Sequence, residues 1–370
     1  MAYSNSARPS EDLCSIADCS THPFDDISLL ICHELRTPLA SIQGALKLLG
    51  YQQSGSLSDD GQRLLAIAIN NADRLNRLAN ALENQPTPLL TLLSGAELEL
   101  LQLENDLHQA VDQQELYLAY QPIVSIEHNQ IIGFEALARW RHGQRGIISP
   151  EVFIPLAEKA GLIDSLGLFL LDQACGQLRQ WQIQFPAVTP LSVSVNLSAV
   201  QLRHPQLVEN IRHILERHHI APHSLKLEVT ESALIENKDL ALKALVELHQ
   251  LGIQLYIDDF GTGYSSLGRL QDLPFDTLKI DRSFIRNKNW AMSEAIFMLA
   301  ERLRLDVIVE GVETLDDLVV LKDLGYKKMQ GYYFSRPIDS AGIACLLMRQ
   351  LLDGQLRFAP EPSSELSSVS

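Results

Sequence analysis

Two kinds of hydrophobic pattern divide the chain. Between about residues 24 and 84, apolar side chains recur every three or four positions, which predicts one amphipathic helix over 24–52 and a second over 59–84. A Ser-Gly-Ser turn at 54–56 separates the two helices. From about residue 115 onward, short β-branched or apolar runs alternate with helical stretches. This second part is therefore predicted to contain a sheet whose strands alternate with helices.

The second predicted helix carries a regular apolar seam. Its positions recur at spacings of three or four residues. They are Leu64, Ile67, Asn71, Leu75, Leu78 and Leu82, of which only Asn71 is polar. A single hairpin of two helices cannot bury such seams on both helices. A dimeric four-helix bundle buries them, so we expect a homodimer, in which the bundle, the barrel or both form the contact.

The larger part shows eight strand-like runs. They read LYLAYQPIV, IIGFEALARW, LSVSVNLS, LKLEVTES, QLYIDDFG, TLKID, DVIVEGVE and YKKMQGYYF. Helical stretches between them include Pro150–Ala160, Leu166–Phe185, Lys238–Leu251 and Ala291–Leu303. Eight strands with intervening helices predict an α/β fold, a TIM-like (β/α)8 barrel. Its start is expected to be irregular, because the first two strands follow one another directly.

These patterns predict five segments in the chain. The terminal segments lack hydrophobic periodicity and are expected to be disordered. In order, the segments are a leader at 1–22, the helical hairpin at 23–85, a linker and helix at 86–110, the barrel at 111–353, and a tail at 354–370.

Composition narrows the range of partners and of cellular locations. The formal net charge is −16, which argues against duplex nucleic acid as a partner. The five cysteines are scattered without a CxxC pair, so neither a disulfide framework nor a zinc site is indicated. No apolar run reaches the roughly 18 residues that a membrane span needs, and no signal peptide is visible. We therefore expect a cytoplasmic protein without a membrane segment.

Polar side chains occur at or near the ends of seven successive predicted strands. They are Glu135, Asn196, Glu228, Asp258, Asp259, Lys279, Glu310 and Gln330. A barrel brings the C-terminal ends of its strands onto one face, so these side chains are predicted to converge. Any one of them, taken alone, is better explained as a cap on a loop or helix. A polar side chain within an apolar strand is costly to bury unless it is paired, and its occurrence on seven successive strands argues for a common site.

The donor set indicates hard divalent cations. It contains carboxylates and an amide but no histidine or cysteine, which suits Mg²⁺ or Mn²⁺ rather than zinc. The Asp258-Asp259 pair indicates two ions, an arrangement that suits in-line phosphoryl displacement. Lys279 is placed to orient the attacking water or to offset transition-state charge, and also to form a salt bridge with a neighbouring carboxylate.

Seven short motifs add a family resemblance. In order, they are EALARW, NLSAVQL, LEVTES, DDFGTGYSSL, LKID, VEGVET and MQGYYFSRP. Together they resemble the EAL family of cyclic di-GMP phosphodiesterases over about residues 100–352. The resemblance implies hydrolysis of cyclic di-GMP to linear pGpG. All of the acids and the lysine that active members need are in place. The stretch between Asp281 and Glu310 looks a few residues shorter than usual, which bears on dimer geometry.

The resemblance also implies a role for each matching residue. The implied ligands of the first metal are Glu135, Asn196, Glu228 and Asp258. Asp259 is implied to bind the second metal, and Lys279 to hold the hydrolytic water. Glu310 is either the general base or a second-metal partner. The implied substrate contacts are Arg139, Gln121 and Gln330, and the implied loop-control elements are Glu231 and residues 260–267.

The segment ICHELRTPLASIQG resembles the phosphoacceptor motif of histidine kinase dimerisation (HisKA) domains. The resemblance covers about residues 24–84 and places His33 at the phosphoacceptor position, beside Glu34. No ATP-binding motif follows before the barrel begins, so autophosphorylation is not expected. Two interpretations stay open. A separate kinase or response regulator exchanges phosphate with His33, or the module serves only to dimerise.

Two alternatives to the enzyme remain at this stage. The barrel of a non-catalytic receptor would bind cyclic di-GMP without cutting it. In a phosphorelay or scaffold protein, the bundle would carry the output. The complete set of acids together with Lys279 favours the enzyme.

Overall fold

The computed structural model describes residues 72, 95–111, 113–188, 190–234, 238–261 and 273–353. The chain divides into two compact units, residues 1–101 and residues 102–370. The predicted helical hairpin, including His33, lies outside the described residues apart from residue 72. So do the predicted disordered leader and tail.

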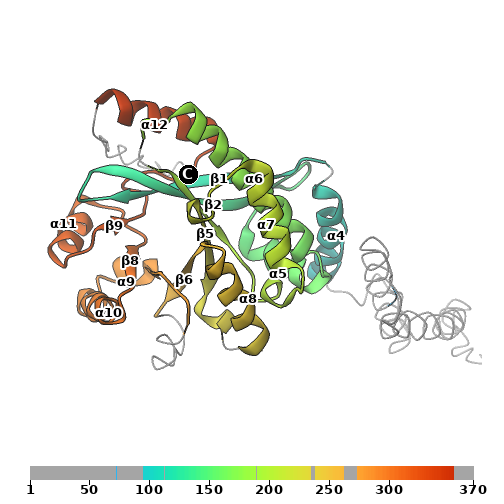
Figure 1. Ribbon diagram of the computed structural model, residues 1–370. Helices are drawn as coiled ribbons and strands as arrows, with labels where there is room; N and C mark the ends of the chain where they lie inside the picture. Colours follow the sequence, from blue (N-terminus) through green and yellow to red (C-terminus); the bar gives the residue numbers. More distant parts are fainter. Residues whose placement is uncertain are drawn as a thin grey trace, which may run out of the picture. The chain divides into compact units, whose positions relative to one another are not determined.

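A closed barrel of eight strands lies at the centre of the described part of the second unit (Figure 1). All eight strands predicted from sequence are confirmed. In order around the barrel, they are β1 (Leu116–Ser125), β2 (Gln130–His142), β4 (Ser192–Asn196), β5 (Leu225–Thr230), β6 (Gln254–Phe260), β7 (Thr277–Ile280), β8 (Asp306–Val309) and β9 (Lys328–Met329).

The predicted irregularity at the start of the barrel is the antiparallel orientation of β1. This strand is antiparallel to both of its neighbours, β2 and β9, whereas the other neighbouring pairs around the barrel are parallel. A short turn joins β1 to β2, and such a turn can join only antiparallel strands. A further strand, β3 (Gly146–Ile148), extends β2 outside the barrel and was not predicted.

Helices surround the strands, and the four predicted stretches match α5, α6, α8 and α10 to within a few residues. The described helices are α4 (Gly95–Ala110), α5 (Pro150–Ala160), α6 (Ile163–Gln184), α7 (Leu207–His218), α8 (Lys238–Gln250), α9 (Arg282–Arg286), α10 (Trp290–Leu303), α11 (Leu315–Asp323) and α12 (Ser340–Asp353). Short 3-10 turns are η1 (Gln201–Arg203), η2 (Pro222–Ser224) and η3 (Glu231–Leu234). Among the described helices, none combines the length and the apolar character of a bilayer span.

Local sequence explains where α5 begins and ends. The Ser149 hydroxyl accepts a hydrogen bond from the Glu151 amide, and Pro150 occupies the first turn, where its missing N–H costs nothing. The helix stops at Gly161, whose φ of 72° suits a residue without a side chain. Because α5 follows the β2–β3 hairpin, its N-cap and first residues, Ser149 to Glu151, form part of the wall of a pocket.

The core lies between the outer face of the barrel and the helices. Trp181 of α6 packs against Tyr120 and Phe134, with ring centroids 4.8 Å apart in both pairs. A smaller apolar cluster of Ile123, Tyr256 and Ile308 is separate from this core. Each of its members lies two residues from a polar site residue, namely Gln121, Asp258 or Glu310, so the cluster lies in the barrel interior beneath the site.

The last turns of α4 pack on the β2–β3 hairpin. Leu103, Leu107 and Ala110 are buried, and Asp106 Oδ2 lies 3.0 Å from His142 Nε2. Beside this contact, the Trp140 indole donates a 2.9 Å hydrogen bond to Glu115 Oε2. The segment that enters the barrel is therefore fixed to β2, the strand that carries Glu135.

Candidate functional site

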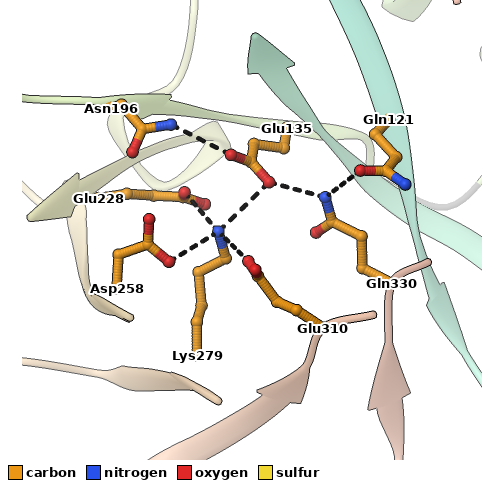
Figure 2. Close-up of polar contacts among 8 residues, drawn as sticks. All are labelled: Gln121, Glu135, Asn196, Glu228, Asp258, Lys279, Glu310 and Gln330. Carbon is orange, nitrogen blue, oxygen red and sulfur yellow. Dashed lines mark hydrogen bonds and ion pairs between the residues drawn. The ribbon is translucent and has the colours of Figure 1, made fainter. Parts of the chain in front are cut away.

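The predicted polar residues meet at one end of the barrel (Figure 2). Strand register explains the convergence: Glu135 on β2 is opposite Gln121 on β1, and Asn196 on β4 is opposite Glu228 on β5. Adjacent inward-facing side chains of paired strands lie side by side. Seven of the eight predicted ring residues are joined by direct contacts. They are Glu135, Asn196, Glu228, Asp258, Lys279, Glu310 and Gln330.

The ammonium group of Lys279 lies at the centre of the ring. It is fully buried and contacts four carboxylates. Its Nζ atom lies 2.6 Å from Glu228 Oε2 and 2.6 Å from Glu310 Oε1. It also lies 3.1 Å from Asp258 Oδ1 and 3.3 Å from Glu135 Oε2. The salt bridge expected for Lys279 is therefore shared among four acids.

Burial and charge oppose each other in this ring. Burial alone would lower the pKa of Lys279, but the four carboxylates raise it well above its ordinary value. Burial raises the pKa of Glu310 to about 8 against the attraction of Lys279. Burial and the neighbouring Glu135 raise the pKa of Glu228 well above its usual range. One ammonium group cannot neutralise four carboxylates, so the ring favours additional positive charge.

Amide groups hold Glu135 on both of its oxygens. Asn196 Nδ2 donates to Glu135 Oε1 over 3.1 Å, and Gln330 Nε2 donates to Oε2 over 2.7 Å. Gln330 Nε2 also donates to Gln121 Oε1 over 3.0 Å, and Gln121 Nε2 donates to the Ser335 carbonyl over 3.0 Å. Burial would raise the pKa of Glu135, but Lys279 and these amides lower it below its ordinary value.

Asp259 differs from its neighbour Asp258. The pairing of β6 with β7 shifts register between Ile257 and Phe260, and Asp259 adopts a φ of 54°. This left-handed conformation is uncommon for a residue with a side chain and is a source of local strain. The bulge leaves Asp258 in the ring and places Asp259 on the wall of the adjoining pocket. Burial and then Asp258 raise the pKa of Asp259 to about 6.

A pocket of about 600 Å³ opens beside the ring. This volume lies within the usual range for small-molecule sites. Of the predicted residues, its walls include Glu135, Glu310, Gln121, Gln330 and Arg139. The half-buried Arg139 donates a 2.8 Å hydrogen bond to the Ala138 carbonyl. The predicted substrate contacts therefore line the same pocket as Glu135, Asp259 and Glu310.

The ring offers oxygen donors that suit a hard cation. Glu228 Oε1 is buried and has no hydrogen-bond partner among the described residues, which is costly for a polar atom and leaves this oxygen as a donor to an ion. Asn196 donates its amide N–H to Glu135, so its carbonyl oxygen remains as a donor to an ion. No three His, Cys, Asp or Glu side chains within the described ranges already surround a metal position. The Lys279 ammonium lies between the carboxylates instead.

The predicted loop-control residue lies at the edge of the ring. Glu231 begins η3 directly after β5 and is 4% exposed. Its Oε2 accepts a 3.3 Å hydrogen bond from the Gly261 amide, at the end of β6. Glu231 thus connects two neighbouring strand ends. Most of the predicted control loop, from residue 262 onward, lies outside the described residues.

A support behind Asn196 was missed in the sequence. Gln201 is 3% exposed, and its Oε1 accepts a 3.0 Å hydrogen bond from the Ser198 amide. The Ser198 hydroxyl also donates to Glu158 of α5. These bonds fix the turn that follows β4. A Ser and a Gln three residues apart after a strand were the available signal, but on its own that pattern is common.

Comparisons with known proteins agree with this geometry. A family model described as the EAL domain matches residues 104–337, and one described as the His Kinase A (phospho-acceptor) domain matches residues 30–84. The chain is 35% identical over 339 residues to "Cyclic di-GMP phosphodiesterase NbdA" of Pseudomonas aeruginosa, covering 90% of this chain and 43% of that protein.

A second curated relative comes from the same organism, and a solved complex is also similar to this chain. The chain is 44% identical over 247 residues to "Bifunctional diguanylate cyclase/cyclic di-GMP phosphodiesterase MucR", covering 65% of this chain and 36% of that protein. The structure "PaMucR Phosphodiesterase, c-di-GMP complex" is 43% identical with a TM-score of 0.62, covering 65% of this chain and 99% of that one. The chain thus spans less than half the length of these curated relatives.

Proposed function

Because this chain belongs to the EAL domain family, we propose that it is a divalent-metal-dependent phosphodiesterase that hydrolyses cyclic di-GMP to linear pGpG. The observation that carries the proposal is the ring of four buried or half-buried carboxylates around Lys279, at the wall of a pocket of about 600 Å³. Relatives named as cyclic di-GMP phosphodiesterases and a solved complex with that ligand support the choice of substrate.

The metal ligands follow from the donor set. In our proposal Glu135, Asn196, Glu228 and Asp258 hold one ion, and Asp259 contributes to a second. Oxygen ligands favour Mg²⁺ or Mn²⁺. Such ions polarise a phosphoryl oxygen and lower the pKa of a bound water. The unpartnered Glu228 Oε1 and the surplus of carboxylates over cations support this assignment.

Lys279 and Glu310 act on the water in this scheme. The reaction adds water across one P–O3′ bond, so that the new P–O bond forms as the ribose oxygen leaves. The Lys279 ammonium donates a hydrogen bond that holds the attacking oxygen. Glu310, 2.6 Å from Lys279 Nζ, either accepts the water's proton or completes the second metal site. Both roles require the carboxylate at this position.

The pocket wall supplies the substrate contacts. Arg139 offers a guanidinium group that suits a phosphate oxygen, and Gln121 and Gln330 offer amides. All three line the pocket that adjoins the ring. Cyclic di-GMP carries two phosphodiesters, so we propose that the ring and Arg139 share the binding of its negative charge.

Release of pGpG from cyclic di-GMP tests the proposal. The full chain with Mg²⁺ or Mn²⁺ is expected to form pGpG, and Glu135→Ala and Lys279→Ala are each expected to abolish it. Glu216→Ala is a matched control, because that side chain is 66% exposed on α7. Tight binding of cyclic di-GMP without any pGpG would contradict the enzyme and favour a receptor.

The N-terminal module is proposed to dimerise and to receive a signal. The match of residues 30–84 to the phospho-acceptor family supports His33 as the modified residue, with a separate kinase or response regulator as the donor. The test compares label transfer from phosphodonor proteins to the wild type and to His33→Gln. Transfer that persists in the variant removes His33 from the scheme. If the cellular phenotype of the wild-type protein is lost in His33→Gln but kept in Glu135→Ala, the result would instead favour a phosphorelay protein.

A further inference from the structure

The side-chain amide of Gln330 has a fixed orientation. Gln330 is 3% exposed, and its Nε2 lies 2.7 Å from Glu135 Oε2 and 3.0 Å from Gln121 Oε1. An ionised carboxylate only accepts hydrogen bonds, so the NH₂ group must be the end that faces Glu135. Both of its N–H hydrogens are therefore used within the protein.

The backbone holds Gln330 rigidly. The backbone N–H of Gln330 donates to the Val309 carbonyl over 2.8 Å, and the backbone carbonyl of Gln330 accepts from the Val312 N–H over 3.2 Å. The next residue, Gly331, lies so close to Val312 that a Cβ atom would meet its carbonyl oxygen at 2.1 Å. The orientation of Glu135 is thus determined by the backbone at the ends of β8 and β9.

We infer that Gln330 is a positioning residue that fixes Glu135 for divalent-ion binding. The inference deepens the proposed function and rests on it. A hydrogen bond to a ligating carboxylate holds the ligand in place and reduces the entropy that ion binding costs. Gln121, anchored to the Ser335 carbonyl, holds the Gln330 amide from its other side.

The remaining atom of the amide, Oε1, has no partner within the described part of the protein. The atom is buried, and Gln330 lines the pocket. This oxygen can only accept. The substrate group that meets it therefore carries a hydrogen, as a ribose hydroxyl or a guanine N–H does, whereas an ionised phosphate does not. One residue thus lines the pocket and orients Glu135.

Manganese binding in the absence of cyclic di-GMP tests the inference. Titration calorimetry of the full chain is expected to show about a tenfold or greater loss of Mn²⁺ affinity in Gln330→Met. Gln350→Met is the matched control: Gln350 is 5% exposed on α12, and its Oε1 accepts a 2.8 Å hydrogen bond from the Ile131 amide. This control is expected to lower stability and to keep Mn²⁺ affinity.

A double-mutant cycle separates positioning from general damage. In a Glu135→Gln background, Gln330→Met is expected to change Mn²⁺ affinity less than twofold, because the group on which it acts has changed. An equal loss in both backgrounds, or unchanged affinity in the single variant, overturns the inference. Gln330→Asn, too short to reach both partners, replaces Gln330→Met if that variant does not fold. If the two substitutions are coupled in their effect on Mn²⁺ affinity but the protein releases no pGpG, only the proposed enzymatic activity is contradicted.

Discussion

Lys279 Nζ donates a 2.6 Å hydrogen bond to Glu228 Oε2, and both side chains are completely excluded from solvent. Removing one partner of a buried ion pair leaves the other charge uncompensated, which typically costs about 3–5 kcal/mol. We expect Lys279→Met to lower the free energy of unfolding by this amount without metal. Chemical denaturation measures the change.

Two comparisons check this first prediction. Mn²⁺ is expected to raise the melting temperature of Lys279→Met more than that of the wild type, because a cation then neutralises the orphaned acids. Lys328→Met removes a 2.6 Å pair with Asp306 that is partly exposed, so we expect a loss of only about 0–1 kcal/mol. Equal losses in the two variants would contradict the central role of Lys279.

Gly331→Ala is expected to damage both stability and the site. Its Cβ would meet the Val312 backbone oxygen at 2.1 Å and nitrogen at 2.3 Å, so the ends of β8 and β9 must separate. Overpacking of this kind costs about 1–3 kcal/mol. Thermal denaturation and Mn²⁺ titration are the measurements.

Gly146→Ala separates this steric effect from backbone strain. Gly146 has a φ of 73°, and no atom lies within 4 Å of the added Cβ. We expect a cost of about 1–2 kcal/mol from the left-handed conformation, and unchanged Mn²⁺ affinity. Loss of Mn²⁺ binding in this variant would count against the role of the Gly331 contact.

The packing of α4 on β2 makes a further prediction. Leu107 is 3% exposed, whereas Leu100 on the same helix is 47% exposed. Leu107→Ala is expected to cost about 2–5 kcal/mol and to speed hydrogen exchange in α4. Leu100→Ala is expected to stay within about 0.5 kcal/mol of the wild type. Similar effects of the two substitutions would argue that α4 does not dock through this face.

Stability is expected to depend on pH through Asp317, in the capping box of α11. Burial would raise the pKa of Asp317, but hydrogen bonds from Lys288 and Thr314 lower it below its ordinary value of 3.8. A lowered pKa in the folded state adds stability above the unfolded pKa, and this stability is lost as pH falls through the folded value. Asp317→Asn is therefore expected to cost about 1 kcal/mol at pH 7, and less at pH 3.

Asp316→Asn provides the control for charge. Asp316 is exposed in the same first turn of α11, so this variant changes the net charge equally without removing the capping box. Denaturation of the three proteins at both pH values gives the result. A cost of Asp317→Asn that is the same at pH 7 and pH 3 would contradict the role of the ionised side chain.

Short β-branched or apolar runs predicted the strands, and the convergence of the ring was predicted because a barrel brings the C-terminal ends of its strands onto one face. Glu135, Asn196 and Glu228 could be placed together in this way. The separation of Asp258 from Asp259 could not, since it depends on a bulge. Bulges follow from the pairing of β6 with β7, which local pattern does not encode.

Contacts between distant segments were equally hidden. The 2.7 Å bond from Gln330 to Glu135 joins residues 195 positions apart, and both ends depend on side-chain orientation within the closed barrel. The strand β3 has only three residues, too few to show an alternation. Sequence therefore predicted which groups meet, whereas their pairing required the structure.

The closure of the barrel has a consequence for the order of synthesis. The first strand, β1, pairs with the last, β9, and the amide that holds Glu135 comes from the residue directly after β9. A nascent chain on the ribosome that has not yet released residue 330 therefore lacks one wall of the site, even with its acids already made. The full set of contacts around Glu135 can therefore form only after residue 330 has left the ribosome, however early the acids of the ring are made.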